Sequence, residues 1–362
     1  MTTQRITRPL NVYDRFDLVK FVRRIDEMPP PPCALSDNPA LVANWIRKIG
    51  PIETSDVTDL HQLMVNLLIE NGSSVNGARQ WLAIDGPPLV GKTLAVTAAA
   101  LRIHDWLCDN QADDVAAPFE HIPVVIISGN LGDGKLARTL LDKIARFIGV
   151  PLPSRGGFAA ALDCLEAAMR NVGTLLIVVD DAHFIKRSSG TRALTDHLKD
   201  IMTALPASFV FVGAGLQQSA LLHVPSETVA PRSGREQSGS KVLTEGAFQR
   251  SQYSAVEQLR LRMQYFPMRP LPSGDRKQPD DRFIERMLSM IDQLDRVEGF
   301  DPKHLRTITA LKQINARAGG RTGRGLKLIA RIASLAADMG VSPTRAHVYA
   351  VTGMSDEEID RG

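Results

Sequence analysis

The stretch at residues 81–96, WLAIDGPPLVGKTLAV, decides the fold of this chain. Its first four residues are apolar and predict a buried strand, and the alanine-rich run from Leu94 predicts a helix. Between them stands G-x-x-x-x-G-K-T, the pattern of a phosphate-binding loop, which requires a strand before it and a helix after it. The predicted nucleotide-binding residues are Gly86, Pro87, Pro88, Leu89, Val90, Gly91, Lys92, Thr93 and Leu94.

The residue types in this loop suit a nucleoside triphosphate. Gly86 and Gly91 let the backbone wrap around a phosphate, and the helix N-terminus adds partial positive charge. Lys92 can reach the β- and γ-phosphates, and the Thr93 hydroxyl can ligate Mg²⁺. We therefore predict ATP and Mg²⁺ as cofactors, and we expect Lys92 to face solvent when no nucleotide is bound.

A second apolar run, TLLIVV at residues 174–179, ends in the acidic pair Asp180 and Asp181. Unbroken apolar runs are typical of buried parallel strands, and the carboxyl ends of such strands face the ligand crevice. Asp180 is predicted to hold Mg²⁺ directly or through water, and Asp181 to polarise the water that attacks the γ-phosphate. Together with the loop, this pair predicts an ATPase.

Residues 129–136, GNLGDGKL, nearly repeat the phosphate-loop pattern. Leu136 stands at the Ser/Thr position, so the hydroxyl ligand for Mg²⁺ is missing. We interpret this stretch as a tight glycine turn rather than a second nucleotide site. Lys135 and Arg138 remain available there to contact an anion other than the nucleotide.

Composition is that of an ordinary folded protein. The 362 residues suffice for two cores, and the contents of apolar (44%) and charged (23%) residues are those of a soluble globular chain. No apolar run approaches the roughly 18–20 residues of a membrane span, and the start of the chain lacks a signal-peptide core. We expect a cytoplasmic protein without membrane contact. The cysteines have neither disulfide-scaffold nor zinc-site spacing.

Changes in composition divide the chain into four parts. Residues 1–37 end near four consecutive prolines and predict a flexible N-terminal arm, which either docks on a partner or frays. Residues 38–268 are predicted to form the α/β nucleotide-binding domain, and residues 225–252 within it a mobile loop. Residues 269–354 predict a helical lid, and residues 355–362 an acidic tail.

Charge is distributed unevenly although the net charge is only +3. Residues 302–337 contain Lys and Arg but neither Asp nor Glu. A segment of one charge sign can contact the phosphates of DNA, and it can equally be a solvated helical face. The sequence leaves both interpretations open.

The order of these motifs resembles that of AAA+ ATPases and, more narrowly, of the TniB/TnsC family of transposition ATPases, over roughly residues 50–340. The resemblance rests on the segments GPPLVGKT, IPVVIISGN, LLIVVDDAHFI, FVFVGAG, EQLRLRMQYFPM and AGGRTGRGLKLIARIASLAA. It implies an α/β P-loop NTPase fold, with a parallel sheet flanked by helices and a C-terminal helical lid. It also implies self-assembly into a ring or filament on duplex DNA, and recruitment or activation of a transposase of the integrase superfamily.

The same resemblance suggests two arginines for the site. The arginine finger of the family, supplied by a neighbouring subunit, falls on Arg262, with Arg260 as the alternative. Such a finger offsets negative charge on the transferring phosphoryl group. The lid arginine of the family falls on Arg324 or on Arg321.

Two departures from the family pattern suggest slow hydrolysis. Asp181 stands where the family usually has the longer Glu, and Ala214 stands where a polar residue is usual. An Asp-Asp pair is also favoured by signalling ATPases of the STAND type, which are nucleotide-gated scaffolds without a DNA requirement. A helicase loader or related replication ATPase is a third possibility. ATP turnover that depends on DNA would favour the transposition ATPase. ATP turnover that does not depend on DNA would favour the STAND-type signalling ATPase.

Overall fold

The structure is a computed structural model that describes residues 10–18, 20, 30–74, 79–111, 120–130, 136–182, 191–216, 255–271 and 279–353. The predicted loop at residues 225–252, the acidic tail and Lys135 lie outside the described residues. Within the described part of the chain, no helix combines the length and the apolar character that crossing a membrane requires.

Five parallel strands form one sheet in the described part of the chain, and a parallel sheet is what the resemblance implies. Their order across the sheet is β2-β3-β4-β1-β5. They are β1 (Trp81–Asp85), β2 (Val124–Ser128), β3 (Leu176–Asp180), β4 (Ser208–Gly213) and β5 (Met263–Pro267). The central strands β1, β3 and β4 are buried along their whole length, because helices cover both faces of a parallel sheet.

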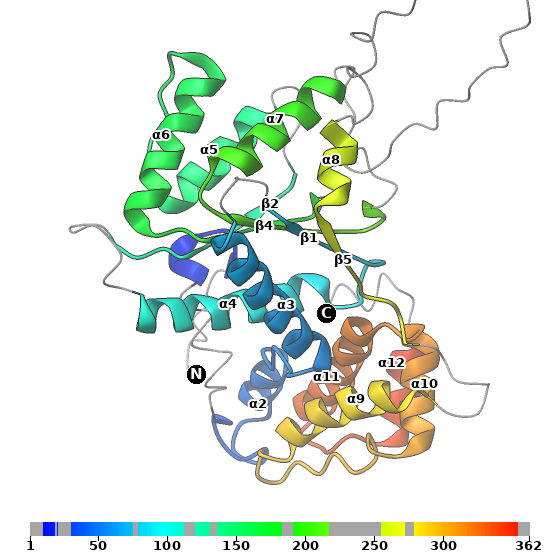
Figure 1. The fold of residues 1–362 in the computed structure, drawn as a ribbon. Coiled ribbons are helices and arrows are strands. Elements are labelled where there is room, and N and C mark those ends of the chain that lie inside the picture. Colours follow the sequence, from blue (N-terminus) through cyan, green and yellow to red (C-terminus); the bar gives the residue numbers. More distant parts are fainter. Residues whose placement is uncertain are drawn as a thin grey trace, which may run out of the picture.

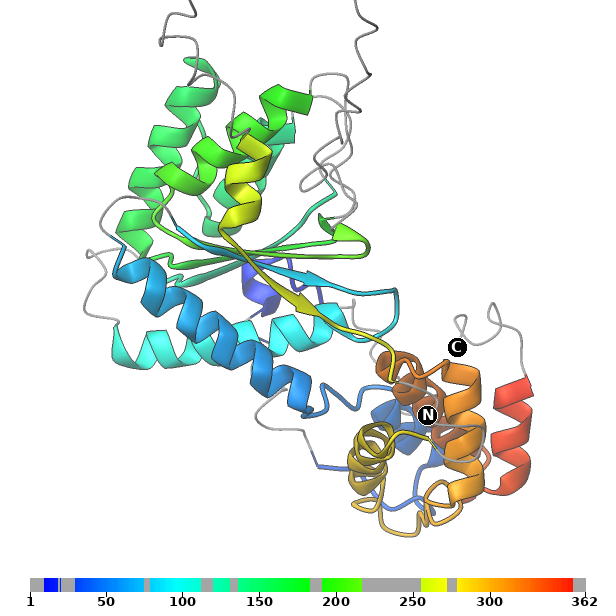
Figure 2. The ribbon, with the colours of Figure 1, turned by 45° about the vertical axis from the view of Figure 1, so that its right-hand side comes forward.

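Helices cover both faces of this sheet, giving a three-layer domain (Figures 1 and 2). One face carries α3 (Ser55–Gly72) and α4 (Lys92–Asn110). The other face carries α5 (Leu136–Ile148), α6 (Gly157–Val172), α7 (Thr191–Ala204) and α8 (Ala255–Leu261). The fold class predicted from the sequence is confirmed by this arrangement.

A second hydrophobic core lies in a separate bundle of helices, the helical lid (Figure 2). Its C-terminal members are α9 (Asp281–Leu294), α10 (Ile308–Ala318), α11 (Thr322–Asp338) and α12 (Arg345–Gly353). The lid also contains α2 (Pro39–Ile46), which buries Val42, Trp45 and Ile46 in this core. The composition of the sequence instead groups that helix with residues 38–268. The difference has a physical cause, since the apolar stripe of α2 is covered by a helix almost 300 residues further along the chain.

A buried arginine ties the lid to the α/β domain. Arg286 of α9 is 5% exposed and donates to the hydroxyl of Thr322 at 2.9 Å and to that of Ser55 at 3.1 Å. It also forms an ion pair with Asp56, the acidic residue in the first turn of α3, at 2.9 Å. Since a buried charge is costly unless it is paired, this cluster fixes where α9 and α11 lie relative to α3.

Candidate nucleotide-binding site

The phosphate-binding loop connects the carboxyl end of β1 to the first turn of α4. The Gly86 amide donates to the carbonyl of Gly213 in β4 at 3.2 Å, which holds the start of the loop against the sheet. The loop ends at Gly91, where a φ of 102° needs a residue without a side chain. The helix begins at Lys92, so its unpaired N-terminal amides face the loop, as the sequence predicts.

Lys92 differs from the sequence expectation that its side chain faces solvent. Its ammonium group donates to the carbonyl oxygens of Gly86 at 2.7 Å and Pro87 at 2.8 Å, within its own loop. Burial lowers the pKa of Lys92, and nearby carboxylates, of which Asp180 has the largest effect, act in the opposite direction. The loop carbonyls therefore satisfy this cation, and phosphate oxygens would have to replace them.

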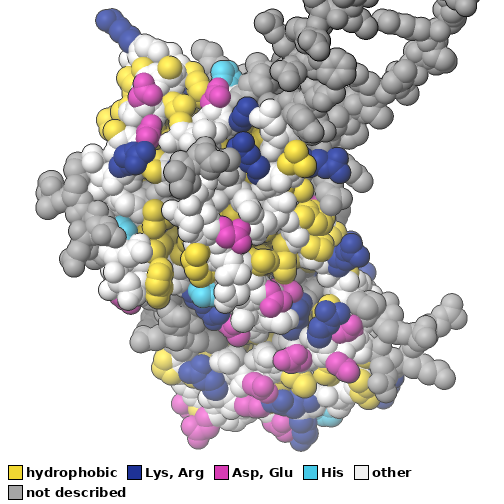
Figure 3. All heavy atoms as spheres, viewed as in Figure 1, with side chains coloured by type: hydrophobic (Ala, Val, Ile, Leu, Met, Phe, Trp, Pro, Cys, Tyr) yellow, Lys and Arg dark blue, Asp and Glu magenta, His cyan; other side chains and the backbone are white. Residues whose placement is uncertain are grey.

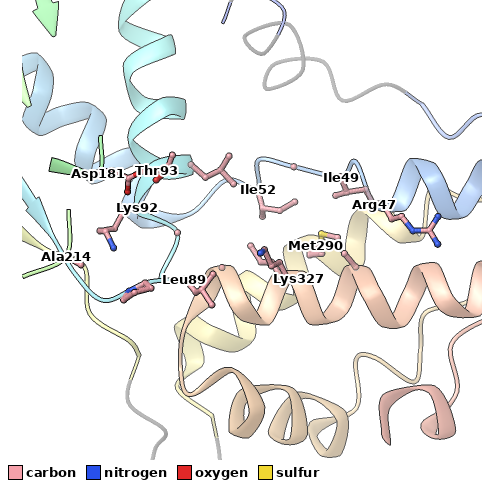
Figure 4. A pocket seen from close by; sticks show the side chains of 17 residues that line it. Arg47, Ile49, Ile52, Leu89, Lys92, Thr93, Asp181, Ala214, Met290 and Lys327 are labelled. Atoms are coloured by element: carbon pink, nitrogen blue, oxygen red, sulfur yellow. The ribbon is translucent and has the colours of Figure 1, made fainter. Parts of the chain in front are cut away.

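A cavity of about 680 Å³ lies between the loop and the lid (Figure 4). This volume is in the range of small-molecule sites. At the loop end it is lined by Lys92 and Thr93, whose hydrogen-bond donors suit phosphates, and by Asp181, whose carboxylate suits a water molecule or a cation. Towards the lid it is lined mainly by apolar side chains, which suit a flat base. These include Ile49, Ile52, Met290, Leu326 and Ala330.

The lid end of the cavity was not predicted from the sequence. Ile49 and Ile52 come from the connection between α2 and α3, and Met290 comes from α9. Lys327 adds a cation from α11. Only Lys327 had a signal in the sequence, because it lies in the segment free of acids. The apolar residues carry no motif and are recognised by their position alone.

The acidic pair lies at the carboxyl end of β3. Asp181 lines the cavity, whereas Asp180 is only 3% exposed and is not one of the lining residues. One oxygen of Asp180, Oδ1, accepts the backbone N–H of Asp181 at 2.8 Å. Asp181 has a φ of 55°, a left-handed conformation that Asp and Asn adopt more readily than most residues. The backbone conformation at this position therefore favours Asp.

The donor set here fits Mg²⁺, which prefers hard oxygen ligands. Thr93 offers a hydroxyl at the start of α4, and Asp180 offers a carboxylate at the end of β3. Ala214, by contrast, lines the cavity with a methyl group where a polar side chain is usual in the family.

Two further polar groups at the site were missed by the sequence analysis. The Tyr13 hydroxyl donates to Oδ2 of Asp180 at 2.9 Å, and burial together with Asp180 raises the pKa of Tyr13. Asp85, the last residue of β1, accepts from the Tyr265 hydroxyl at 3.1 Å. Its other oxygen is buried without a hydrogen-bond partner among the described residues. A single tyrosine in a polar arm, or a single Asp ending an apolar strand, is too common to signal a site.

The lid rests directly on the phosphate-binding loop. The backbone N–H of Arg324 donates to the Leu89 carbonyl at 3.2 Å. Gly323 lies so close that a Cβ on it would stand 2.9 Å from that same oxygen. Arg324, the lid arginine expected from the resemblance, thus contacts the loop through its backbone N–H. Neither Arg324 nor Arg321 lines the cavity, and Lys327 does so instead.

Arg262 lies at the amino-terminal end of the strands, whereas the phosphate-binding loop of its own chain follows the carboxyl-terminal end of β1. Its carbonyl accepts the N–H of Trp81, and the next residue, Met263, pairs with Trp81 at the start of β1. The loop begins after the other end of β1, five residues and about 16 Å away at the usual rise of a strand. The backbone of Arg262 therefore lies at the opposite end of β1 from the phosphate-binding loop of its own chain. Arg260, two residues earlier, is exposed.

Several cations that the sequence left available are engaged in the structure. Arg138 forms an ion pair with Asp142 at 3.0 Å and donates to the Pro153 carbonyl at 2.9 Å, so it links α5 to the loop before α6. In the acid-free segment, Arg306 pairs with acidic residues of and just after α9, among them Asp292 at 2.8 Å. Acidic and basic side chains are interspersed over the part of the lid that Figure 3 shows.

Comparisons with known proteins agree with this fold. A family model described as an AAA domain matches residues 75–218. The Aeropyrum pernix ORC2 protein, solved as ADPNP–ADP complexes, is similar over 86% of this chain and 72% of its own, with a TM-score of 0.56 and 13% identity. The Aeropyrum pernix ORC1 protein in complex with DNA is similar over 85% of this chain and 68% of its own, with a TM-score of 0.53 and 14% identity.

Drosophila ORC bound to DNA is similar over 89% of this chain and 68% of its own, with a TM-score of 0.52 and 14% identity. No curated protein sequence matches the chain. At such low identity these likenesses show the fold, which is that of an AAA+ P-loop NTPase. The matched AAA domain and the nucleotide cavity support ATPase activity.

Proposed function

We propose that this protein is an ATP-dependent regulator that assembles on duplex DNA and recruits or activates a transposase of the integrase superfamily. The cavity between the phosphate-binding loop and the lid carries the proposal, because a nucleotide there would contact both parts of the chain. Nucleotide state would then set the position of the lid. Such a protein acts in the cytoplasm, as the sequence predicts.

In this proposal the polar end of the cavity performs the hydrolysis. Lys92 exchanges its two loop carbonyls for phosphate oxygens. Thr93 and Asp180 would hold Mg²⁺, which would supply positive charge next to the phosphates of the bound nucleotide. Asp181 orients the attacking water. Hydrolysis is slow because Ala214 has no polar side chain that could hold this water or the γ-phosphate. A slow ATPase suits a switch that is timed by nucleotide state.

Self-assembly is proposed from the position of Arg262. The backbone of this arginine lies at the opposite end of β1 from its own loop, so the arginine would act on the site of a neighbouring subunit. A ring or filament of subunits would place one such arginine at each site. Its positive charge would offset negative charge on the phosphoryl group during transfer.

The DNA and transposase parts of the proposal rest on the motif order shared with the TniB/TnsC family. The likeness to proteins solved with DNA bound is consistent with a DNA-binding AAA+ ATPase. The same likeness favours a second candidate, a replication ATPase that needs DNA but no transposase. A STAND-type signalling ATPase, the third candidate, would not need DNA.

Fluorescence anisotropy with a labelled duplex tests the DNA claim across nucleotide states and salt concentrations. We expect binding that tolerates any sequence, requires ATP and falls steeply with salt, because counterions are released from the phosphates. Assembly multiplies the few phosphate contacts of one subunit, so the salt dependence should grow with assembly size. Absence of binding with every nucleotide would refute the proposal and favour the signalling candidate.

Two lysines of the acid-free segment provide a matched pair for this experiment. Lys312 is exposed on α10, whereas Lys303 pairs with Asp301 at 2.9 Å. Lys312→Ala should weaken DNA binding and reduce the salt dependence by about one counterion per subunit. Lys303→Ala should have the smaller effect. If neither Lys312→Ala nor Lys303→Ala changed DNA binding, residues 302–337 would be a solvated helical face and would not contact DNA.

A further inference from the structure

A segment of the predicted N-terminal arm is packed against the α/β domain, close to the end of β3. Residues 10–18 contain a short turn of helix, drawn in dark blue beside the sheet in Figures 1 and 2. Leu18 is buried in the same core as the sheet, and Val12 and Tyr13 pack against that core. Asp14 caps the turn by accepting the backbone N–H of Phe16 at 3.0 Å. This part of the arm is therefore an element of the domain.

The segment touches the site through one hydrogen bond. The Tyr13 hydroxyl donates to Oδ2 of Asp180 at 2.9 Å, across 167 residues of sequence. The other carboxylate oxygen, Oδ1, accepts from the backbone N–H of Asp181. Both oxygens of a carboxylate that is 3% exposed are thus held by protein donors. This pair of donors fixes the plane of the Asp180 carboxylate.

We propose that Tyr13 is a positioning residue for Asp180, so that residues 10–18 form part of the Mg²⁺-nucleotide site. The inference rests on the proposed function, in which Asp180 helps to hold Mg²⁺. Each carboxylate oxygen can accept more than one hydrogen bond or contact, so an oxygen bound by Tyr13 can still face the ion or its water. Groups that hydrogen-bond to metal ligands orient them, and their removal typically costs 10–100-fold in metal affinity or activity.

The chemistry of the contact favours orientation over proton transfer. Tyr13 is half-buried against the core, so its ring has a fixed place from which the hydroxyl reaches the carboxylate. A neutral hydroxyl leaves the charge of Asp180 in place, whereas an arginine or lysine there would neutralise it and compete with Mg²⁺. The hydroxyl thus holds the carboxylate in one orientation without removing the charge that attracts the ion.

Tyr13→Phe in the full chain removes the hydroxyl and keeps the ring. The experiment measures binding of a fluorescent ATP analogue while Mg²⁺ is titrated, and again in EDTA. We expect the Mg²⁺ concentration at half-maximal binding to rise about 10-fold, with affinity in EDTA unchanged. A merely structural role of the tyrosine would change both measurements or neither. Thermal unfolding of both proteins, without nucleotide, checks that the fold is retained.

Phe16→Ala is the control variant, because Phe16 belongs to the same segment but is 66% exposed. It should leave the Mg²⁺ titration unchanged. An unchanged titration in Tyr13→Phe would overturn the proposal. A lower Mg²⁺ requirement would also overturn it, since Tyr13 would then compete with the ion. If the wild-type chain bound no nucleotide at all, the proposed function itself would fail, and the role of Tyr13 with it.

Discussion

Replacing Gly323 by alanine should separate the lid from the phosphate-binding loop. The added Cβ would stand 2.9 Å from the Leu89 carbonyl oxygen and 3.3 Å from the amide nitrogen of Gly91. Both are backbone atoms, so neither can turn aside as the end of a flexible side chain would. The loop or the first turn of α11 must therefore move, and the hydrogen bond from Arg324 to Leu89 lies directly in the affected contact.

The cost can be worked from this contact. Inserting a methyl group into a packed site costs about 1–3 kcal/mol, and the hydrogen bond at risk contributes about 1 kcal/mol. If the lid moves away to avoid the clash, ATP loses its contacts at the lid end of the cavity. A loss of about 1–3 kcal/mol in binding free energy corresponds to a Kd that is roughly 5- to 150-fold weaker.

Isothermal titration calorimetry with ATP and Mg²⁺ measures this change. Gly72→Ala is the matched control, because Gly72 ends α3 and a Cβ there meets nothing within 4 Å. Alanine favours a helix over glycine by about 0.5–1 kcal/mol, so the control also reports the general effect of this substitution on stability. An ATP affinity of Gly323→Ala equal to that of the control would refute the idea that the lid must rest on the loop.

Substitutions of four other residues test the roles of the site. Lys92→Ala should weaken ATP binding about 100-fold or more in calorimetry, because hydrogen bonds to a charged group contribute about 1.5–3 kcal/mol each; an unchanged Kd would show that the nucleotide binds elsewhere. Asp181→Asn should bind ATP normally and slow single-turnover hydrolysis by about 10²–10⁴-fold, since Asn also tolerates the left-handed backbone and only the charge is lost; equal rates would remove Asp181 from the reaction. Arg262→Ala should slow ATP turnover of the assembled protein by about 10³-fold or more, and Arg260→Ala should not; the opposite ranking would move the finger to Arg260.

Much of the α/β domain could be predicted because its signals are local. The strand, loop and helix around Lys92 lie within one short stretch, and each has its own sequence pattern. The same holds for β3 with Asp180 at its end. Backbone geometry follows from such patterns, so the sequence placed the loop and the acidic residues at the carboxyl ends of their strands.

The lid half of the site could not be predicted, because it depends on packing between distant segments. Ile49 lines the cavity only because α2 is held in the lid core, and the sequence analysis placed that helix in the other domain. Tyr13 reaches Asp180 only because its segment is anchored by Leu18. The inward turn of the Lys92 side chain is also unpredictable, since it depends on which carbonyls the folded loop presents.

The chain passes between the lid and the α/β domain at two described places, residues 47–54 and residues 268–271. A body attached by a single flexible segment can swing in any direction, whereas one attached at two separate points turns mainly about the line that joins them. These two passages therefore favour rotation of the lid about the line that joins them. Ile49 and Ile52, which line the cavity, belong to the first of these passages. The base of a bound nucleotide would therefore contact the chain at the rotation axis itself. A small rotation there would produce a larger displacement at the far end of the lid.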